Sequence, residues 1–343
     1  MCEESKTEII NKIVIIGNGF DLANDLPTSY NDFILWYLKD YLEKAYAKGS
    51  IYSDGLISTN SCVSKTNFSV FDLNIFRETL ETNFKHGKID SLFLELILKD
   101  VESKNWVDIE TLYFKEILGI YKSKSDENRK LQKLNNDLKI ITSKLVEYLK
   151  TITKTTKIQP LRGITFRDFF GCKNEDEKSF FINFNYTNTV SQYENHVKNS
   201  VSIQIHGYLH DDGNNPIIFG YGDDTNEHYK TIENLEENLY MQHFKSFWYS
   251  KTDKYEQLLN CLESGKYEVY ILGHSCGLSD RVLLKTIFEH NSCNKIHVFH
   301  HGKNLEQQKK NHFEKVIQIS RHFDDKAKMR KLVSKFNPQY CFN

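Results

Sequence analysis

The chain has 343 residues, of which 27% are charged, and its formal net charge is −1 with an isoelectric point near 6.9. This near-neutral balance gives no electrostatic footprint for duplex nucleic acid. No apolar run reaches membrane-spanning length, and the start of the chain lacks the basic and apolar segments of a signal peptide. The seven scattered cysteines form no CxxC pair, so we expect reduced thiols in a cytoplasmic protein without membrane association.

The first predicted element is a strand over residues 9–16 that leads into a glycine turn. Its β-branched apolar run is typical of a strand buried on both faces of a parallel sheet. Gly17 and Gly19 lack a Cβ, so the backbone can turn sharply and approach a ligand. With a helix after it, such a turn can hold a phosphate. Leu22 stands where a full GxGxxG fingerprint requires its third glycine, so a plain tight turn is the alternative.

The next part of the chain is mainly helical in its pattern. Apolar residues at helical spacing predict helical stretches over residues 30–47, 73–101, 106–121 and 131–153. Residues 50–72 are rich in Ser, Thr and Asn and are expected to form an irregular surface segment. We therefore expect a mainly helical insertion over residues 46–165. Its Asp108 and Glu110 either reach the cleft or lie on a helix surface.

The second half of the chain alternates short apolar runs with polar or glycine-rich tips. These runs predict five further strands, over residues 178–184, 201–205, 216–219, 268–272 and 295–299. With the first strand they predict an α/β fold, a Rossmann-like, mostly parallel sheet of about six strands built from residues 1–45 and 166–343. Ligands bind where the strands of such sheets end, so the polar tips should meet the glycine turn on one rim.

Two side chains at these tips have useful chemistry. His206, followed by Gly207, ends one strand and can act as a base near neutral pH. A histidine hydrogen-bonded at the sheet edge is the alternative. Asn185, beside Tyr186, can donate and accept hydrogen bonds, which suits a ribose hydroxyl or a water molecule. An Asx turn at the strand exit would also explain this asparagine.

The segment Gly-His-Ser-Cys-Gly at residues 273–277 fits the GxSxG nucleophile elbow of serine hydrolases. A hydrolase would then need an acid such as Asp324 or Asp325 and a histidine between His297 and His322. Few residues remain to carry these partners. A tight turn that holds a ligand ribose, or holds nothing, ranks above the hydrolase.

The histidines and lysines near the end of the chain suggest no further site. His297, His300, His301 and His312 lack acidic or cysteine partners at ligand spacing, so we expect no bound metal. The lysine-rich stretch from residue 303 to residue 331 alternates with acids and glutamines. It is expected to form a solvated helix face.

Seven short motifs follow one another between Ile13 and Asp280. They are Gly17-Asn18-Gly19-Phe20-Asp21, Leu26-Pro27-Thr28-Ser29-Tyr30, Trp106-Val107-Asp108-Ile109-Glu110, Asn183-Phe184-Asn185-Tyr186-Thr187, Ile205-His206-Gly207, Phe219-Gly220 and Gly273-His274-Ser275. This ordered set resembles the AbiH family of bacteriophage abortive-infection proteins. That family in turn resembles sirtuin-like NAD-binding domains.

The resemblance implies NAD+ as substrate and gives roles to individual residues. His206 would be the catalytic histidine, and Asn185 would act beside it at the nicotinamide ribose. The residues implied to bind the phosphates, the riboses or the adenosine side are Gly17, Asn18, Gly19, Asp21, Tyr186, Gly207, Gly273, His274 and Ser275. Thr187 departs from the sirtuin-like pattern, which has Asp there. The absence of CxxC pairs speaks against an acyl-lysine substrate.

The function implied is an antiphage effector that hydrolyses NAD+ to nicotinamide and ADP-ribose upon infection, in response to a phage-derived trigger. Nicotinamide is cationic in NAD+ and leaves as a neutral molecule, so one base, one orienting amide and a phosphate cradle would suffice. The alternatives are a non-catalytic nucleotide-binding sensor and a serine hydrolase that depends on Ser275. Homo-oligomerisation is left open.

Overall fold

The computed structural model of the chain describes residues 9–60, 71–84, 87–102, 109–162, 165–210 and 213–342, with residues 100–102 described for their backbone only. Trp106 and Asp108 of the predicted motifs lie outside these residues, as do Cys2, Cys62 and the N-terminal segment before residue 9. The cysteines inside them are free thiols. None of the described helices is long and apolar enough to cross a membrane.

A five-stranded parallel sheet lies at the centre of the fold. Its strands are β1 (Asn11–Ile16), β5 (Ser179–Asn183), β6 (Ser200–Gln204), β7 (Tyr267–Leu272) and β8 (Cys293–Val298). They stand in the order β6-β5-β1-β7-β8, and every neighbouring pair is parallel. The chain adds β5 and β6 on one side of β1 and then β7 and β8 on the other, so the order reverses between β1 and β7. This topology confirms the predicted Rossmann-like α/β fold.

One predicted strand is wrong. Residues 216–219 form no strand of the sheet, which has five strands among the described residues and not about six. Ile218 donates one backbone hydrogen bond to the carbonyl of His206, at 2.9 Å. This bond places the segment beside the exit of β6, and Pro216 at its start has no N–H to donate to a ladder. A short apolar run beside glycines does not by itself show whether the segment pairs with the sheet.

The burial of β1 explains its apolar sequence. Alternate side chains of a strand point to opposite faces, so Ile13 and Ile15 pack into one core cluster, and Val14 and Ile16 pack into another. All four are fully buried. A strand with helices on both faces has no polar side, as the run of β-branched residues indicated.

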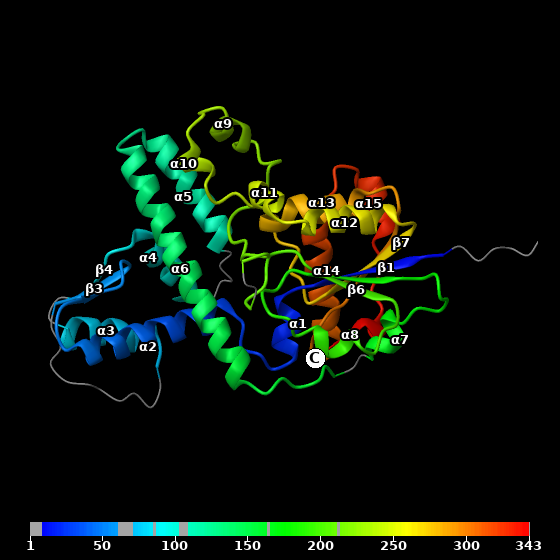
Figure 1. Ribbon diagram of the computed structural model, residues 1–343, viewed down its shortest axis with the longest axis horizontal. Coiled ribbons are helices and arrows are strands. Elements are labelled where there is room, and N and C mark those ends of the chain that lie inside the picture. Colours follow the sequence, from blue (N-terminus) through cyan, green and yellow to red (C-terminus); the bar gives the residue numbers. More distant parts are fainter. Residues whose placement is uncertain are drawn as a thin grey trace, which may run out of the picture.

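Helices cover both faces of the sheet, as Figure 1 shows. On one face lie α1 (Asn18–Ala23), α7 (Phe166–Phe170) and α8 (Ser191–Glu194). On the other lie α12 (Lys254–Glu263), α13 (Arg281–Glu289), α14 (Leu305–Ser320) and α15 (Lys326–Leu332). Three 3-10 turns complete this part: η1 (Tyr249–Lys251), η2 (Leu278–Asp280) and η3 (Pro338–Tyr340).

A second layer of helices lies beside the sheet (Figure 1). Its long helices are α2 (Tyr30–Lys48), α3 (Leu73–Asn83), α4 (Leu92–Glu102), α5 (Ile109–Ser123) and α6 (Glu127–Thr155). The short helices α9 (Tyr229–Glu233), α10 (Asn238–Met241) and α11 (Lys245–Trp248) come from the second half of the chain. One apolar core joins residues from both halves, with Phe114 of α5 stacked on Tyr221 at a ring distance of 4.0 Å.

The first long helix, α2, begins at a capping box. Ser29 caps α2 by accepting from the Asp32 N–H, while the Asp32 carboxylate accepts from the Ser29 N–H.

The region expected to be an irregular surface segment instead contains β2 (Tyr52–Ser53) and β3 (Ile57–Thr59). These pair with β4 (Lys88–Ile89) in a small antiparallel sheet. Leu56 and Ile57 are fully buried there, because they join the helical core.

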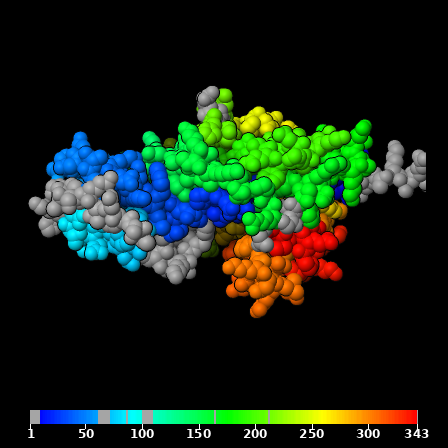
Figure 2. Space-filling view, turned by 90° about the horizontal axis from the view of Figure 1, so that it is seen from below, coloured from blue at the N-terminus to red at the C-terminus, as the bar shows by residue number. Residues whose placement is uncertain are grey.

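The fold gathers distant segments at one edge of the sheet. Figure 2 shows the blue residues from the first part of the described chain between green residues from the middle of the chain and the orange and red C-terminal part. This placement follows from the strand order, since β1 separates β5 from β7. The order of the sheet reverses between β1 and β7, and such a switch point is where open α/β sheets bind ligands.

Candidate functional site

A cavity of about 350 Å³ opens at the carboxyl edge of the sheet. Its walls come from the tips of β1, β5, β6 and β7 and from helices α5, α6 and α14. Ten of the eleven residues that the sequence assigned to binding or catalysis line it. The exception is Gly207, where an added Cβ would lie 2.2 Å from the carbonyl oxygen of Pro216. The volume falls in the range of about 300 to 1,000 Å³ that is usual for small-molecule sites.

The glycine turn after β1 is interlocked with the turn after β7. A Cβ on Gly17 would lie 2.4 Å from the Cα of His274, and one on Gly273 would lie 2.2 Å from the backbone nitrogen of Phe20. The Gly19 N–H donates to the Gly273 carbonyl at 2.8 Å. The contact between these interlocked turns is therefore enough to require glycine, whether or not a ligand is bound.

His206 lies just after β6, and only 4% of it is exposed. Its Nε2 is 3.3 Å from the hydroxyl of Tyr249 and 3.4 Å from Oδ1 of Asp280. Burial, reinforced by the positive charge of Lys245, lowers the pKa of His206 to about 3. The imidazole is therefore neutral at pH 7, and a neutral ring keeps one nitrogen as a hydrogen-bond acceptor.

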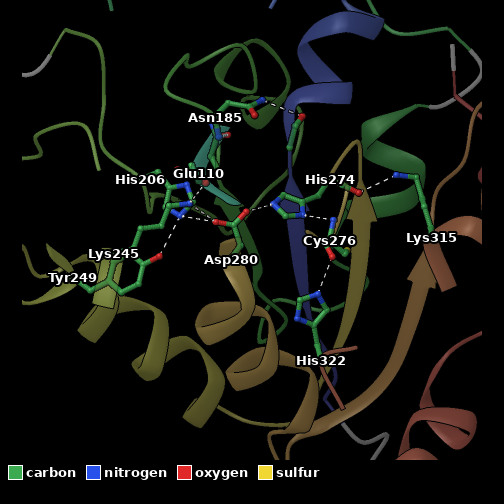
Figure 3. A network of polar contacts seen from close by, with 12 residues as sticks. Glu110, Asn185, His206, Lys245, Tyr249, His274, Cys276, Asp280, Lys315 and His322 are labelled. Carbon is green, nitrogen blue, oxygen red and sulfur yellow. Dashed lines mark hydrogen bonds and ion pairs between the residues drawn. The ribbon is translucent and has the colours of Figure 1, made fainter. Parts of the chain in front are cut away.

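Three charged side chains lie around this histidine, and we call Glu110, Lys245 and Asp280 the acid–lysine cluster (Figure 3). Glu110 and Lys245 are buried, and the side chain of Asp280 is 13% exposed. The Nζ of Lys245 lies 2.8 Å from Oε2 of Glu110 and 2.7 Å from Oδ1 of Asp280. Burial opposes the charge of Lys245, but the two carboxylates outweigh it and hold its pKa well above the ordinary value. Burial likewise opposes ionisation of Asp280, but Lys245 and two histidines hold its pKa well below the usual range. Two carboxylates and one ammonium give the cluster a formal charge of −1.

His274 is the second histidine beside Asp280. Its Nδ1 accepts a hydrogen bond from the Cys276 N–H at 3.0 Å, so a neutral ring carries its proton on Nε2. That Nε2 lies 3.4 Å from Oδ2 of Asp280. The Asp280 carboxylate is thus flanked by two imidazoles, one on each oxygen.

Asn185 and Asp21 line the wall beside the glycine turn. The Asn185 amide donates to the carbonyl of Gly17 at 3.1 Å, and its N–H donates to Oδ1 of Asn183 at 3.0 Å, so Asn183 makes the Asx turn. Asp21 is 1% exposed and accepts a hydrogen bond from Thr187, the residue that departs from the sirtuin-like pattern. Burial raises the pKa of Asp21 to about 6, against the effect of that hydrogen bond.

The GxSxG segment lacks the geometry of a nucleophile elbow. The positive φ angles of the turn are at Gly273, with +76°, and at Cys276, with +57°, and not at Ser275. Burial raises the pKa of the Cys276 thiol to about 12, and His322 hydrogen-bonds to the Cys276 carbonyl at 2.9 Å. Within the described part of the chain, no histidine is hydrogen-bonded to the Ser275 hydroxyl. An acid–histidine–serine relay is therefore not assembled at this turn.

The C-terminal part of the chain reaches the cavity through Lys315 of α14 and His301. The expectation of a fully solvated lysine face is wrong for Lys315, which is half-buried and donates to the carbonyl of His274 at 2.9 Å. Lys309 and Lys310 on the same helix are exposed. In the described ranges, no group of three His, Cys, Asp or Glu residues is arranged to hold a metal ion.

Sequence reasoning missed Lys245 and Tyr249 and gave Asp280 no role in the cavity. Lys245 is one of 45 Lys and Arg residues and lies outside every predicted strand and helix, so no spacing marks it. Glu110 does line the cavity, from the first turn of α5. One feature of the sequence could have placed Asp280 at the cavity. It follows shortly after a strand tip, and such residues lie at the rim of the sheet.

Comparison with known proteins gives one family match. A family model described as bacteriophage abortive infection AbiH matches residues 13–301. This range contains both interlocked turns and the whole acid–lysine cluster, and it ends before Lys315. No curated protein and no solved structure matches the chain. The sirtuin-like resemblance therefore stays a prediction.

Proposed function

The chain belongs to the AbiH family of bacteriophage abortive-infection proteins, and we propose that it serves this role by cleaving NAD+ to nicotinamide and ADP-ribose in the cavity. The observation that carries the proposal is the acid–lysine cluster, which lines the cavity at the switch point of the sheet together with the neutral His206 and with His274. A phage-derived signal would start the reaction, since a constitutive NADase would harm an uninfected cell.

The net negative charge of the cluster suits this bond cleavage. As the bond between C1′ of the ribose and the nicotinamide nitrogen breaks, its electron pair leaves with the nicotinamide and the ribose gains oxocarbenium character. A unit positive charge about 4 Å from a unit negative charge gains about 4 kcal/mol at an effective dielectric constant of about 20. We assign this stabilisation to Asp280, whose charge is already fixed by Lys245.

The water that attacks C1′ must lose a proton as the new C–O bond forms. His206 is neutral at pH 7, so a ring nitrogen can accept this proton, and the negative Asp280 beside it stabilises the imidazolium that results. Asn185 lines the same cavity and can orient a ribose hydroxyl. No general acid is needed, because nicotinamide departs as a neutral molecule.

The test is the NAD+ content of phage-infected cells that express the protein. We expect NAD+ to fall and nicotinamide to rise after infection, and we expect His206→Ala to abolish both changes and the protection against phage. His210→Ala is the matched control, because His210 is an exposed histidine outside the cavity. Thermal unfolding of both purified variants establishes that they fold.

A non-catalytic nucleotide sensor is the second candidate. The low pKa of His206 favours it, because a group with a pKa of about 3 is a weak base before any substrate binds. A sensor would bind NAD+ without releasing nicotinamide and would tolerate His206→Ala. Stable NAD+ in infected cells that survive, or full protection by His206→Ala, would remove the hydrolysis proposal and leave the sensor.

A further inference from the structure

The cavity has two chemically different parts, and His274 lies between them. The imidazole of His274 faces Asp280, with 3.4 Å between Nε2 and Oδ2. Its backbone carbonyl faces away and accepts from the Nζ of Lys315 at 2.9 Å. Figure 3 shows the two groups on opposite sides of His274. One part of the cavity therefore carries the net negative acid–lysine cluster, and the other carries a cation.

The two cavity lysines differ in how their charge is balanced. Lys245 has two carboxylates within 3 Å. Lys315 has none at ion-pair distance among the residues that the structure describes, and its one hydrogen-bond partner there is the His274 carbonyl. Burial lowers the pKa of Lys315 below its ordinary value. A half-buried ammonium without a counter-charge is costly, and an anionic ligand in the cavity would offset that cost.

The interlocked turns leave little else to receive an anion. Gly17 is held against His274, and Gly19 is held against Gly273. The N–H groups of Gly17 and Gly19 already donate to the carbonyls of Leu272 and Gly273. The helix that follows, α1, has only six residues. Ser275, by contrast, is an exposed residue that lines the cavity, and it directly follows His274, whose carbonyl Lys315 contacts.

We propose that Lys315, assisted by the hydroxyl of Ser275, forms an anion subsite that binds a phosphate group of the ligand. This inference rests on the proposed function and deepens it, because it orients the dinucleotide. The diphosphate lies at Lys315, and the reacting ribose lies beyond His274 at Asp280. The phosphate contact thus comes from a C-terminal helix and not from the N-terminal glycine turn, where the motif pattern placed it.

The experiment is calorimetric titration of the purified full-length chain with ADP-ribose, which carries both phosphates and cannot be cleaved at the nicotinamide bond. We expect Lys315→Gln to weaken binding about 10- to 100-fold, the loss of one charge-assisted hydrogen bond. Lys315→Arg keeps the charge and should bind within about 10-fold of the unmodified chain. Lys310→Gln, an exposed lysine of the same helix, should leave the affinity unchanged.

The subsite proposal is overturned by equal affinities of Lys315→Gln and the unmodified chain, or by the absence of ADP-ribose binding to the unmodified chain. It is also overturned if Lys315→Arg loses as much affinity as Lys315→Gln, because the charge would then not matter. The proposed function fails separately. Binding of ADP-ribose that depends on Lys315, with no nicotinamide formed from NAD+, would contradict cleavage and leave the subsite in place.

Discussion

The interlocked turns and the acid–lysine cluster line one cavity but are built in opposite ways. The turns meet through backbone atoms, and their glycines allow a contact that any Cβ would prevent. The cluster consists of charged side chains from α5, α11 and η2 that meet only in the folded chain. The turns therefore fix where the cavity lies, whereas the cluster decides which chemistry suits it.

Removing the charge of Lys245 from the cluster should have the largest effect on the free energy of unfolding. Lys245→Met leaves Glu110 and Asp280 buried without their ammonium, and we expect a loss of about 3–5 kcal/mol in the free energy of unfolding. Urea titration measures this loss. The triple variant with Glu110→Gln and Asp280→Asn removes all three charges and should recover most of it. A loss below about 1 kcal/mol in Lys245→Met would show that the cluster is not buried as described.

The effect of Asp21, which lies beside the turns, on the stability of the fold should depend on pH. Its pKa of about 6 in the folded chain lies above the ordinary 3.8, so the folded state favours the protonated carboxyl. The unfolded chain therefore loses its proton first, and Asp21 destabilises the fold progressively as pH rises from about 4 to 6. At about 1.4 kcal/mol per pKa unit, the full cost approaches 3 kcal/mol at pH 7.

Asp21→Asn removes this cost because an amide stays neutral. We expect the variant to be more stable than the unmodified chain at pH 7, by up to about 3 kcal/mol, and the gain to vanish below about pH 4. Denaturant unfolding at several pH values measures the gain. A difference that does not change with pH would show that Asp21 titrates at its ordinary value.

Adding a Cβ to the turns should destabilise the fold for steric reasons alone. In Gly17→Ala the new Cβ meets the backbone of His274, so we expect a loss of about 1–3 kcal/mol or more in the free energy of unfolding. Gly119→Ala in α5 is the matched control, because its Cβ would meet no atom within 4 Å. That variant should gain about 0.5–1 kcal/mol from the helix preference of alanine. Equal stabilities of the two variants would remove the interlocking of the turns from the account.

The sequence indicated the turns far better than the cluster, for a physical reason. Short apolar runs and glycine pairs record backbone geometry, which is local, so the strands around Gly17 and Gly273 and the rim position of His206 could be predicted. Lys245 and Lys315 take their roles from partners far along the chain, and isolated lysines in a charged sequence carry no periodic signal. The strand predicted at residues 216–219 is wrong for a related reason, because strand pairing depends on tertiary contacts.

The most direct measurement follows the release of nicotinamide by protein purified from phage-infected cells. The substrate is NAD+ labelled in the nicotinamide ring, and the product is separated by chromatography. We expect release by the unmodified chain and by Asp224→Asn, which changes an exposed acid outside the cavity, and a rate lower by about 10²- to 10⁴-fold in Asp280→Asn. Label that stays in NAD+ with the unmodified chain, or equal release by Asp280→Asn, would contradict the account.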